Sequence, residues 1–165
     1  GTGVLTTALK RGLVGREVAA AHLEAAVEGM KQLNRAAAAA ARRHHAHAVT
    51  DVTGFGLLGH AGEMARASGV CLRIEAASVP LLAGARDCAL GCQSQGLLNN
   101  QAYAAGSVVW AATVAEELRA LLHDPHTRGG LLLSLPAGEA AREGAGARIG
   151  TVMAARADGC CLEVV

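Results

Sequence analysis

The sequence predicts an α+β fold in which helices pack on a mixed β-sheet. Apolar residues recur at helical spacing near the start of the chain, and short segments rich in valine, isoleucine and leucine recur later. No internal repeat or long linker divides the 165 residues. Helices grouped at the front and a hairpin expected at the end fit this class better than a doubly wound parallel sheet. We therefore expect one globular domain spanning residues 1–165.

The predicted helices begin with a short segment at 4–10 that ends before Gly12. Amphipathic spacing predicts a longer helix over 17–30, and an alanine-rich stretch kept soluble by arginines predicts another over 33–44. The glycine- and amide-rich segment 91–100 is expected to be a loop. Further helices are expected at 57–68, 82–90, 114–122 and 137–144.

The predicted strands are short segments bounded by turn residues or histidines. The segment 46–52 is apolar and β-branched, and it is followed by the turn sequence TGFG. The segment 70–75 alternates apolar and polar residues, which is typical of a half-buried strand. An apolar strand is expected at 130–135. Two last strands, at 147–154 and 160–165, are expected to form a hairpin around the turn Asp158-Gly159.

Composition excludes several classes of protein. The chain is 52% apolar and 18% charged with a net charge of +1, so neither a nucleic-acid footprint nor a membrane-surface patch is indicated. It contains no apolar run of the roughly 20 residues that a membrane span requires, and no signal peptide. Five cysteines without paired CxxC units argue against a disulfide framework and a zinc ribbon. We expect an intracellular protein with reduced thiols.

The segment TDVTGFGLLGH at 50–60 is the most informative part of the sequence. It places the carboxylate of Asp51 at the end of an apolar run, then Gly54 and Gly56, and then a helix. Glycines let backbone amides approach an anion, a helix N-terminus attracts phosphate, and a carboxylate oxygen suits Mg²⁺. The alternative is that Asp51 or Thr53 only caps the helix while the glycines form the turn.

A second cluster of polar residues comprises His44, His45 and His47. Such a cluster can bind a transition metal. Its helical spacing and the adjacent arginine pair instead favour a solvated helix end, so we assign these histidines no functional role.

Four segments together resemble one family. They are GTGVLTTALKRG at 1–12, AHAVTDVTGFGLLGHAGEMA at 46–65, HDPHTRGGLLLSLP at 123–136 and ARIGTV at 147–152. In this order they resemble the C-terminal half of selenophosphate synthetase, also called selenide, water dikinase, in the aminoimidazole ribonucleotide synthetase superfamily. The resemblance implies a phosphotransferase that converts ATP, selenide and water to selenophosphate, AMP and phosphate. It also implies the C-terminal-domain fold of that superfamily.

The resemblance implies a small set of site residues. Asp51 matches the family's metal-binding aspartate in the TDVTGFG motif, where it would hold Mg²⁺ beside the ATP phosphates. The other residues that it implies for nucleotide binding lie in three glycine-containing segments and are Gly1, Thr2, Gly3, Thr53, Gly54, Gly56, Thr127, Gly129 and Gly130.

One departure from the family pattern concerns the third of these segments. The family usually has a small serine where this chain has Arg128. A long cation at this position either strengthens anion binding or blocks it. The alternative interpretation is that TRGG forms only a tight turn into the following strand.

The resemblance also implies partners. The family's N-terminal domain, absent from this sequence, carries the catalytic cysteine or selenocysteine, a lysine and most of the metal-binding aspartates, and it pairs into a homodimer. We therefore expect no catalytic residue in this chain, and we expect the isolated domain to be an inactive binding or scaffold module. ATP, selenide and the N-terminal domain are the expected partners, in the cytoplasm, with no nucleic acid or membrane. The alternative is another enzyme of the superfamily, such as a thiamine-monophosphate kinase, a purine-pathway synthetase or a hydrogenase-maturation protein.

Overall fold

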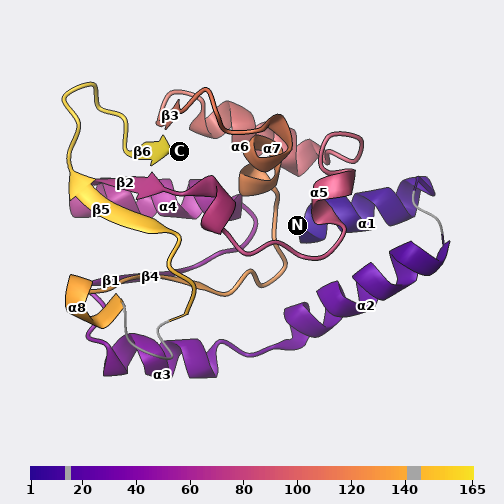
Figure 1. The fold of residues 1–165 in the computed structure, drawn as a ribbon, viewed down its shortest axis with the longest axis horizontal. Coiled ribbons are helices and arrows are strands. Elements are labelled where there is room, and N and C mark those ends of the chain that lie inside the picture. The colour runs from indigo at the N-terminus through magenta and orange to yellow at the C-terminus, as the bar shows by residue number, and fades with distance from the viewer. Residues whose placement is uncertain (14–15, 141–145) are drawn as a thin grey trace.

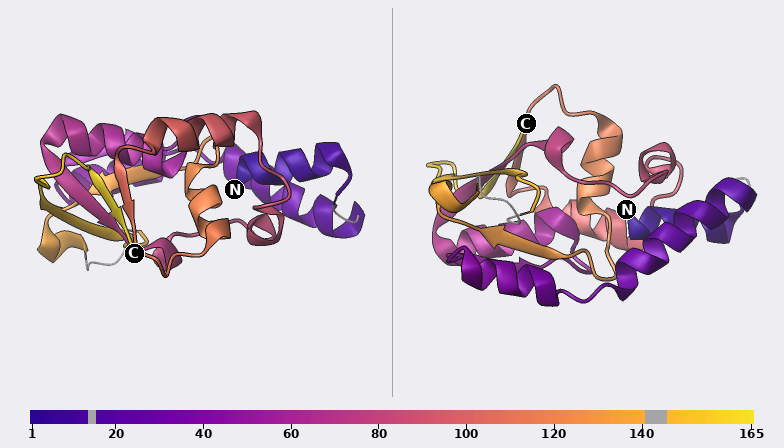
Figure 2. Two further views of the ribbon diagram at one scale, coloured as in Figure 1. Left: turned by 90° about the horizontal axis from the view of Figure 1, so that it is seen from above. Right: turned by 60° about the horizontal axis from the view of Figure 1, so that its bottom comes forward.

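The computed structural model describes residues 1–13, 16–140 and 146–165 (Figure 1). Its first part is helical and consists of α1 (Thr2–Arg11), α2 (Arg16–Lys31) and α3 (Arg35–Arg43). These helices confirm the three predicted near the start of the sequence, with ends shifted by a few residues. Helices α1 and α2 pack against each other and project from one end of the domain, away from the strands (Figures 1 and 2).

The predicted strands at 46–52 and 130–135, which flank the functional site, are confirmed. Strand β1 (Ala48–Asp51) pairs with β4 (Leu131–Ser134) as an antiparallel two-stranded sheet. In this register Ala48 is opposite Ser134 and Asp51 is opposite Leu131. The pairing places the end of β1 next to the start of β4, so the loops that contain TGFG and TRGG leave the sheet together.

A second sheet contains four strands in the order β3-β6-β2-β5. Strand β2 (Val70–Ile74) pairs in antiparallel fashion with β5 (Gly150–Ala154) and in parallel fashion with β6 (Leu162–Val164). Strand β3 (Val108–Trp110), which we did not predict, pairs in parallel fashion with β6. The expectation of a mixed sheet is confirmed, although the strands are divided between two sheets.

The predicted terminal hairpin is wrong. Strands β5 and β6 do not pair, because β2 lies between them. The reason is burial: in β6 both Leu162 and Val164 are completely buried, whereas β5 is mostly exposed and forms an edge of the sheet. The more apolar strand therefore takes an interior position, and the Asp158-Gly159 turn belongs to a longer connection.

Helix α4 (Gly56–Ser68) joins the two sheets because it contacts both β1 and β2. Its buried side chains, including Leu58 and Ala61, belong to one hydrophobic core with β2 and β6. A second core lies among α1, α2, α5 (Ala85–Cys88), α6 (Gln95–Ala104) and α7 (Glu116–His123). Helix α7 contributes Leu122 to the first core and Leu121 to the second, so it holds the two halves of the domain together.

The expectation of a loop over 91–100 is wrong from residue 95 onwards, where α6 begins. The hydroxyl of Ser94 accepts a hydrogen bond from the amide of Leu97 at 3.1 Å and caps this helix. Leu97 is completely buried, which supplies the apolar anchor that the amide-rich composition concealed.

The remaining helices are shorter than predicted or only partly described. In the predicted segment 82–90, α5 contains only Ala85–Cys88. A 3₁₀ helix, η1, spans Ala76–Ser78. In the predicted segment 137–144, α8 spans Ala137–Ala140, and residues 141–144 lie outside the described ranges. Within those ranges, no helix combines the length and the hydrophobicity that a membrane crossing requires.

A first prediction concerns Gly56, which begins α4. Its φ is +68°, and a Cβ atom there would lie 2.7 Å from the backbone carbonyl of His123. Because left-handed geometry costs a non-glycine residue about 1–2 kcal/mol and the clash is with backbone, Gly56→Ala should lower the free energy of unfolding by about 2 kcal/mol or more. Urea denaturation measures this loss.

The matched control is Gly29→Ala in α2, where a Cβ atom would meet no atom within 4 Å. Alanine is the better helix former, so this variant should be neutral or stabilised by up to about 1 kcal/mol. Similar losses for the two variants would contradict the packing that we assign to Gly56.

Candidate functional site

Three loops that are far apart in the sequence meet at one place. They are residues 1–3 before and within α1, 52–56 between β1 and α4, and 124–130 between α7 and β4. Backbone hydrogen bonds join them: the Gly3 amide donates to the Pro125 carbonyl at 3.2 Å, and the His126 amide donates to the Thr53 carbonyl at 3.0 Å. Apart from Asp51, which ends β1 directly before the second loop, all the site residues implied by the resemblance therefore lie in one loop cluster, which contains the N-terminus in Figure 1.

Asp124 holds the first of these loops in place. Its side chain is completely buried, and its Oδ2 accepts hydrogen bonds from the amides of Gly3 at 2.9 Å and Val4 at 3.2 Å. These amides begin α1, so a carboxylate from another element caps this helix. A Cβ atom on Gly3 would collide with Asp124 Oδ1, which explains the need for glycine there. We did not predict this role, because the sequence shows only an aspartate-proline pair after a helix.

Thr2 links the first loop to the third. Its hydroxyl donates to the Pro125 carbonyl at 3.2 Å and accepts from the Thr127 amide at 3.2 Å. Thr2 is buried, whereas Thr127 is exposed. Two residues implied for nucleotide binding thus contact each other, and the Thr2 hydroxyl already has protein partners.

The glycines of the third loop allow close backbone contact with the second. The Gly129 amide donates to the Val52 carbonyl at 2.7 Å, and a Cβ atom on Gly129 would lie 2.8 Å from that same oxygen. Gly130 and Arg128 both adopt positive φ, +88° and +61°. Arg128 is exposed, so its side chain occupies none of the buried space between the loops.

Asp51 differs from these residues because its side chain is exposed. It ends β1 opposite Leu131, on the same side of the strand as Val49, which is also exposed. Among the described residues, no side chain forms a hydrogen bond or ion pair with its carboxylate. Asp51 is thus a carboxylate beside the loop cluster that is available to a ligand.

The alternative that Asp51 or Thr53 caps α4 is wrong. The residue at the N-cap position is Phe55, and no side chain caps the helix. The Thr53 hydroxyl instead lies 3.1 Å from Nε2 of His60, one turn into α4. The Thr53 carbonyl accepts from the Gly56 amide at 3.0 Å, so the turn itself is closed by backbone.

Asn100 is a residue of the site that the sequence did not reveal. Its Nδ2 donates to the carbonyls of Gly54 and His123, both at 2.9 Å, and its side chain is buried. It therefore fixes the glycine turn against the end of α7. The only available signal was an asparagine in a segment that we expected to be a loop, where a polar residue is unremarkable.

The residues present fit one part of a magnesium site. Mg²⁺ is typically bound by one or two carboxylates together with substrate phosphates and water. Asp51 supplies one such carboxylate, but no group of three potential metal-binding side chains occurs within the described part of the chain. Asp51 can bind Mg²⁺ only as one ligand among several, with the other oxygen atoms coming from water, a nucleotide or another domain.

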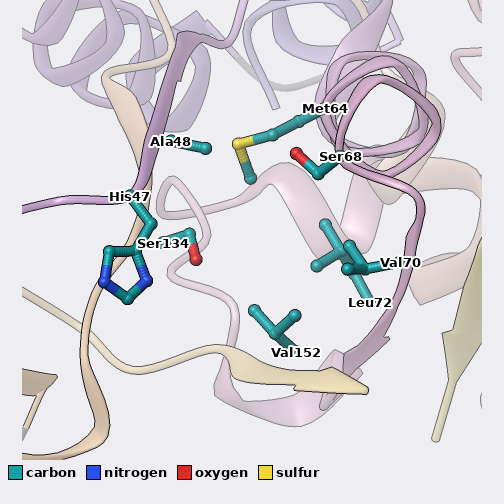
Figure 3. Close-up of a pocket in the computed structure, with 8 residues that line it drawn as sticks. All are labelled: His47, Ala48, Met64, Ser68, Val70, Leu72, Ser134 and Val152. Atoms are coloured by element: carbon teal, nitrogen blue, oxygen red, sulfur yellow. The ribbon is translucent and has the colours of Figure 1, made fainter. Parts of the chain in front are cut away.

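An apolar pocket lies at the other end of the β1–β4 sheet (Figure 3). It has a volume of about 260 Å³ and opens between the two sheets beside α4. Its lining is formed by His47, Ala48, Met64, Ser68, Val70, Leu72, Ser134 and Val152. Because His47 and Ser134 mark the opposite ends of the paired strands from the loop cluster, this pocket is separate from the candidate site.

The histidine cluster is partly different from our expectation. His45 and His47 are exposed, as expected of a solvated helix end. His44 is buried, and its Nδ1 lies 2.9 Å from Oε2 of Glu139 in α8. The expectation is wrong for His44 because α8 folds over the end of α3. All five cysteines are free thiols, as predicted.

Comparison with known proteins identifies the family to which this chain belongs. The family described as AIR synthase related protein, C-terminal domain, matches residues 1–156, so the chain belongs to that family. The fold, with helices packed on a mixed four-stranded sheet and an antiparallel two-stranded sheet, agrees with this assignment.

Individual relatives share a more specific name. The chain is 40% identical over 136 residues to a selenide, water dikinase of Clostridioides difficile (strain 630), with 82% of this chain and 38% of that protein covered. It is 43% identical over 143 residues to a selenide, water dikinase of Trichlorobacter lovleyi, with 86% of this chain and 40% of that protein covered. The chain thus spans about two fifths of the length of these relatives.

A second prediction concerns the histidines of the loop cluster. Burial lowers the pKa of His126 to about 4, with a smaller contribution from the positive charge at Gly1, and burial also lowers the pKa of His123. An unfolded histidine has a pKa of about 6.5. Between these values the unfolded chain binds more protons, so stability is fully present above about pH 6.5 and decreases as pH falls toward 4.

Urea denaturation at about pH 7 and about pH 5 measures this decrease. His126→Asn should reduce the difference in the free energy of unfolding between the two conditions, because it removes one of the two depressed groups. His45→Asn is the matched control, since His45 is exposed and asparagine tolerates its positive φ. An unchanged pH dependence in His126→Asn would contradict the assignment.

A third prediction concerns Asn100. Asn100→Ala removes two hydrogen bonds and leaves the carbonyls of Gly54 and His123 without this partner. The free energy of unfolding should decrease by about 2 kcal/mol. Asn99→Ala is the control, because the neighbouring Asn99 is exposed and should cost less than about 0.5 kcal/mol. Equal stabilities of the two variants would show that the bridge contributes nothing.

Proposed function

We propose that this chain is the C-terminal domain of a selenophosphate synthetase, in which its loop cluster completes the binding site for Mg²⁺ and ATP. The enzyme would convert ATP, selenide and water to selenophosphate, AMP and phosphate. The relatives named selenide, water dikinase support this proposal, and their identity to this chain covers more than four fifths of it. The observation that carries it is the free carboxylate of Asp51 at the edge of the three joined loops.

The division of roles within the site follows from the contacts. Asp51 would provide one oxygen ligand to Mg²⁺, which when bound neutralises phosphate charge during phosphoryl transfer. Thr53, Gly54 and Gly56 hold the turn beside it, and their positions are fixed by His60, Asn100 and the backbone of His123. The chain's own contribution is thus to place a charged oxygen on a rigid turn.

The two other segments would border the nucleotide site together with the turn at 53–56. Gly1, Thr2 and Gly3 are bonded to Asp124, Pro125 and Thr127, so their main task is to fix the third loop. Thr127, Gly129 and Gly130 then present an exposed turn toward the nucleotide. Arg128, exposed within it, supplies a positive charge that suits polyphosphate.

The remaining parts of the reaction would come from an N-terminal domain. No group of three metal-binding side chains exists in the described residues, and the cysteines here are structural: four of the five are buried. We propose that the N-terminal domain supplies the nucleophile and most metal ligands, that the complete enzyme is a homodimer, and that it works in the cytoplasm. The five free thiols are consistent with a reducing compartment.

Another enzyme of the same superfamily is the alternative function. A thiamine-monophosphate kinase, a purine-pathway synthetase or a hydrogenase-maturation protein would share the fold and the use of ATP. The names of the matched relatives favour selenophosphate synthesis over these activities.

A fourth prediction tests this proposal in a chimera. This chain would replace the matched C-terminal part of the Clostridioides difficile selenide, water dikinase, and formation of selenophosphate would be followed by ³¹P NMR. Asp51→Asn should reduce the rate about tenfold or more, because it removes the charge of a metal ligand while preserving its volume. Asp87→Asn, an exposed aspartate on α5, is the matched control and should leave the rate within about twofold.

Two results would count against the proposal. One is a folded parent chimera that makes no selenophosphate, and the other is an Asp51→Asn variant with the parent rate at saturating Mg²⁺. The isolated 165-residue chain should make no selenophosphate in the same assay.

A further inference from the structure

A chain of hydrogen bonds leads from the candidate site into α4. The Thr53 hydroxyl lies 3.1 Å from Nε2 of His60, and Nδ1 of His60 lies 3.1 Å from Oε2 of Glu63. The His60 side chain is 11% exposed, whereas the Glu63 side chain is 46% exposed. A nearly buried imidazole therefore connects a residue of the site loop to a solvated carboxylate.

The partners of the ring determine which nitrogen carries hydrogen. An ionised carboxylate can only accept a hydrogen bond, so Nδ1 of His60 donates to Glu63. In the neutral imidazole Nε2 is then the acceptor, and the Thr53 hydroxyl donates its hydrogen to it. Thr53 thus donates to His60, and His60 donates to Glu63, so each hydrogen bond is donated in the direction from the site loop to the protein surface.

This order changes what Thr53 can offer to a ligand. Its one hydroxyl hydrogen is occupied by His60, so the oxygen is left with lone pairs alone. Its backbone carbonyl accepts from the amides of Gly56 and His126, which fixes the residue further. Thr53 is therefore a rigid acceptor, suited to a cation or its bound water and unsuited to donating to a phosphate oxygen.

We propose that His60 and Glu63 are positioning residues that hold the Thr53 hydroxyl as an oxygen ligand for a divalent cation, directly or through one water. This inference rests on the proposed function and extends it, since Thr53 joins Asp51 two residues earlier as a cation contact. His60 would act through Thr53, as the outer partners of metal ligands commonly do.

A purely structural role for His60 makes a different prediction. The ring also packs against Phe55, with centroids 5.6 Å apart, so its loss will lower stability in either case. Two amide substitutions separate the roles. The amide of His60→Gln reaches the place of Nε2 and can still accept from Thr53, whereas the shorter amide of His60→Asn reaches only the place of Nδ1 and loses Thr53.

The first test uses the isolated 165-residue chain and requires no activity. Nitrogen-15 NMR of the neutral imidazole should show hydrogen on Nδ1 and none on Nε2, and hydrogen on Nε2 alone would overturn the inference. Mn²⁺, added as a probe for the cation, should broaden the amide signals of Asp51 and Thr53. Half-broadening should require about tenfold more Mn²⁺ in His60→Asn and less than about threefold more in His60→Gln.

The second test measures the Mg²⁺ dependence of the chimera. The Mg²⁺ concentration for half-maximal rate should rise about tenfold in His60→Asn and in Thr53→Val, and should stay near the parent value in His60→Gln and Thr53→Ser. The double variant Thr53→Val with His60→Asn should be no worse than either single variant, because both remove one interaction. Melting temperatures report the structural losses separately.

The outcomes distinguish this inference from the proposed function. If Asp51→Asn impairs the chimera but His60→Asn and His60→Gln require the same Mg²⁺ and Mn²⁺ concentrations, only the positioning role is wrong. Absence of Mn²⁺ broadening in the parent chain would also overturn it. If Asp51→Asn has no effect, the proposed function fails first.

Discussion

The buried carboxylate of Asp124 is the constraint on which the rest of the site depends. Burying a charge costs several kcal/mol unless hydrogen bonds compensate it. The amides of Gly3 and Val4 provide that compensation at Oδ2, and the N-terminal end of the α1 dipole adds to it, whereas the buried Oδ1 accepts no hydrogen bond from the described residues. Oδ2 of Asp124 can receive these hydrogen bonds only if α1 begins beside the loop that follows α7. This one requirement places the first and third loops of the site together.

Close contacts at two glycines and the side-chain amide of Asn100 hold the second loop against the third loop and α7. Gly56 and Gly129 allow backbone to approach backbone at distances that a Cβ atom would prevent. Asn100 bonds the turn at Gly54 to the end of α7, whose next residue is Asp124. The loop cluster is therefore held by backbone hydrogen bonds and by the side chains of Asp124, Thr2 and Asn100, which leaves the Asp51 side chain available to a ligand.

Local patterns predicted the parts of this fold that depend on local chemistry. Periodic apolar residues predicted α2, the glycine turn predicted the start of α4, a β-branched run predicted β1, and alternating apolar and polar residues predicted β2. The three glycine-containing segments were also recognisable, since their motifs are contiguous in sequence. Strand β3 was missed because three residues carry little pattern, and the position of β6 was misjudged because strand order depends on competition for the interior.

The contacts that organise the site could not be predicted, because they join residues far apart in the chain. Asp124 and Gly3 are 121 residues apart, and Asn100 and Gly54 are 46 apart. No local signal distinguishes a buried aspartate that caps a distant helix from one that ends its own. The burial of His44 and His60 was not predicted for the same reason, because it depends on elements that pack over them.

The most direct test of the central claim is a crystal structure of the chimeric enzyme with Mg²⁺ and a non-hydrolysable ATP analogue. The account predicts a carboxylate oxygen of Asp51 about 2.1 Å from a Mg²⁺ ion that also contacts the nucleotide phosphates. It also predicts that the three loops keep the hydrogen bonds seen here. A nucleotide and Mg²⁺ bound away from this cluster, with Asp51 in solvent, would contradict the claim.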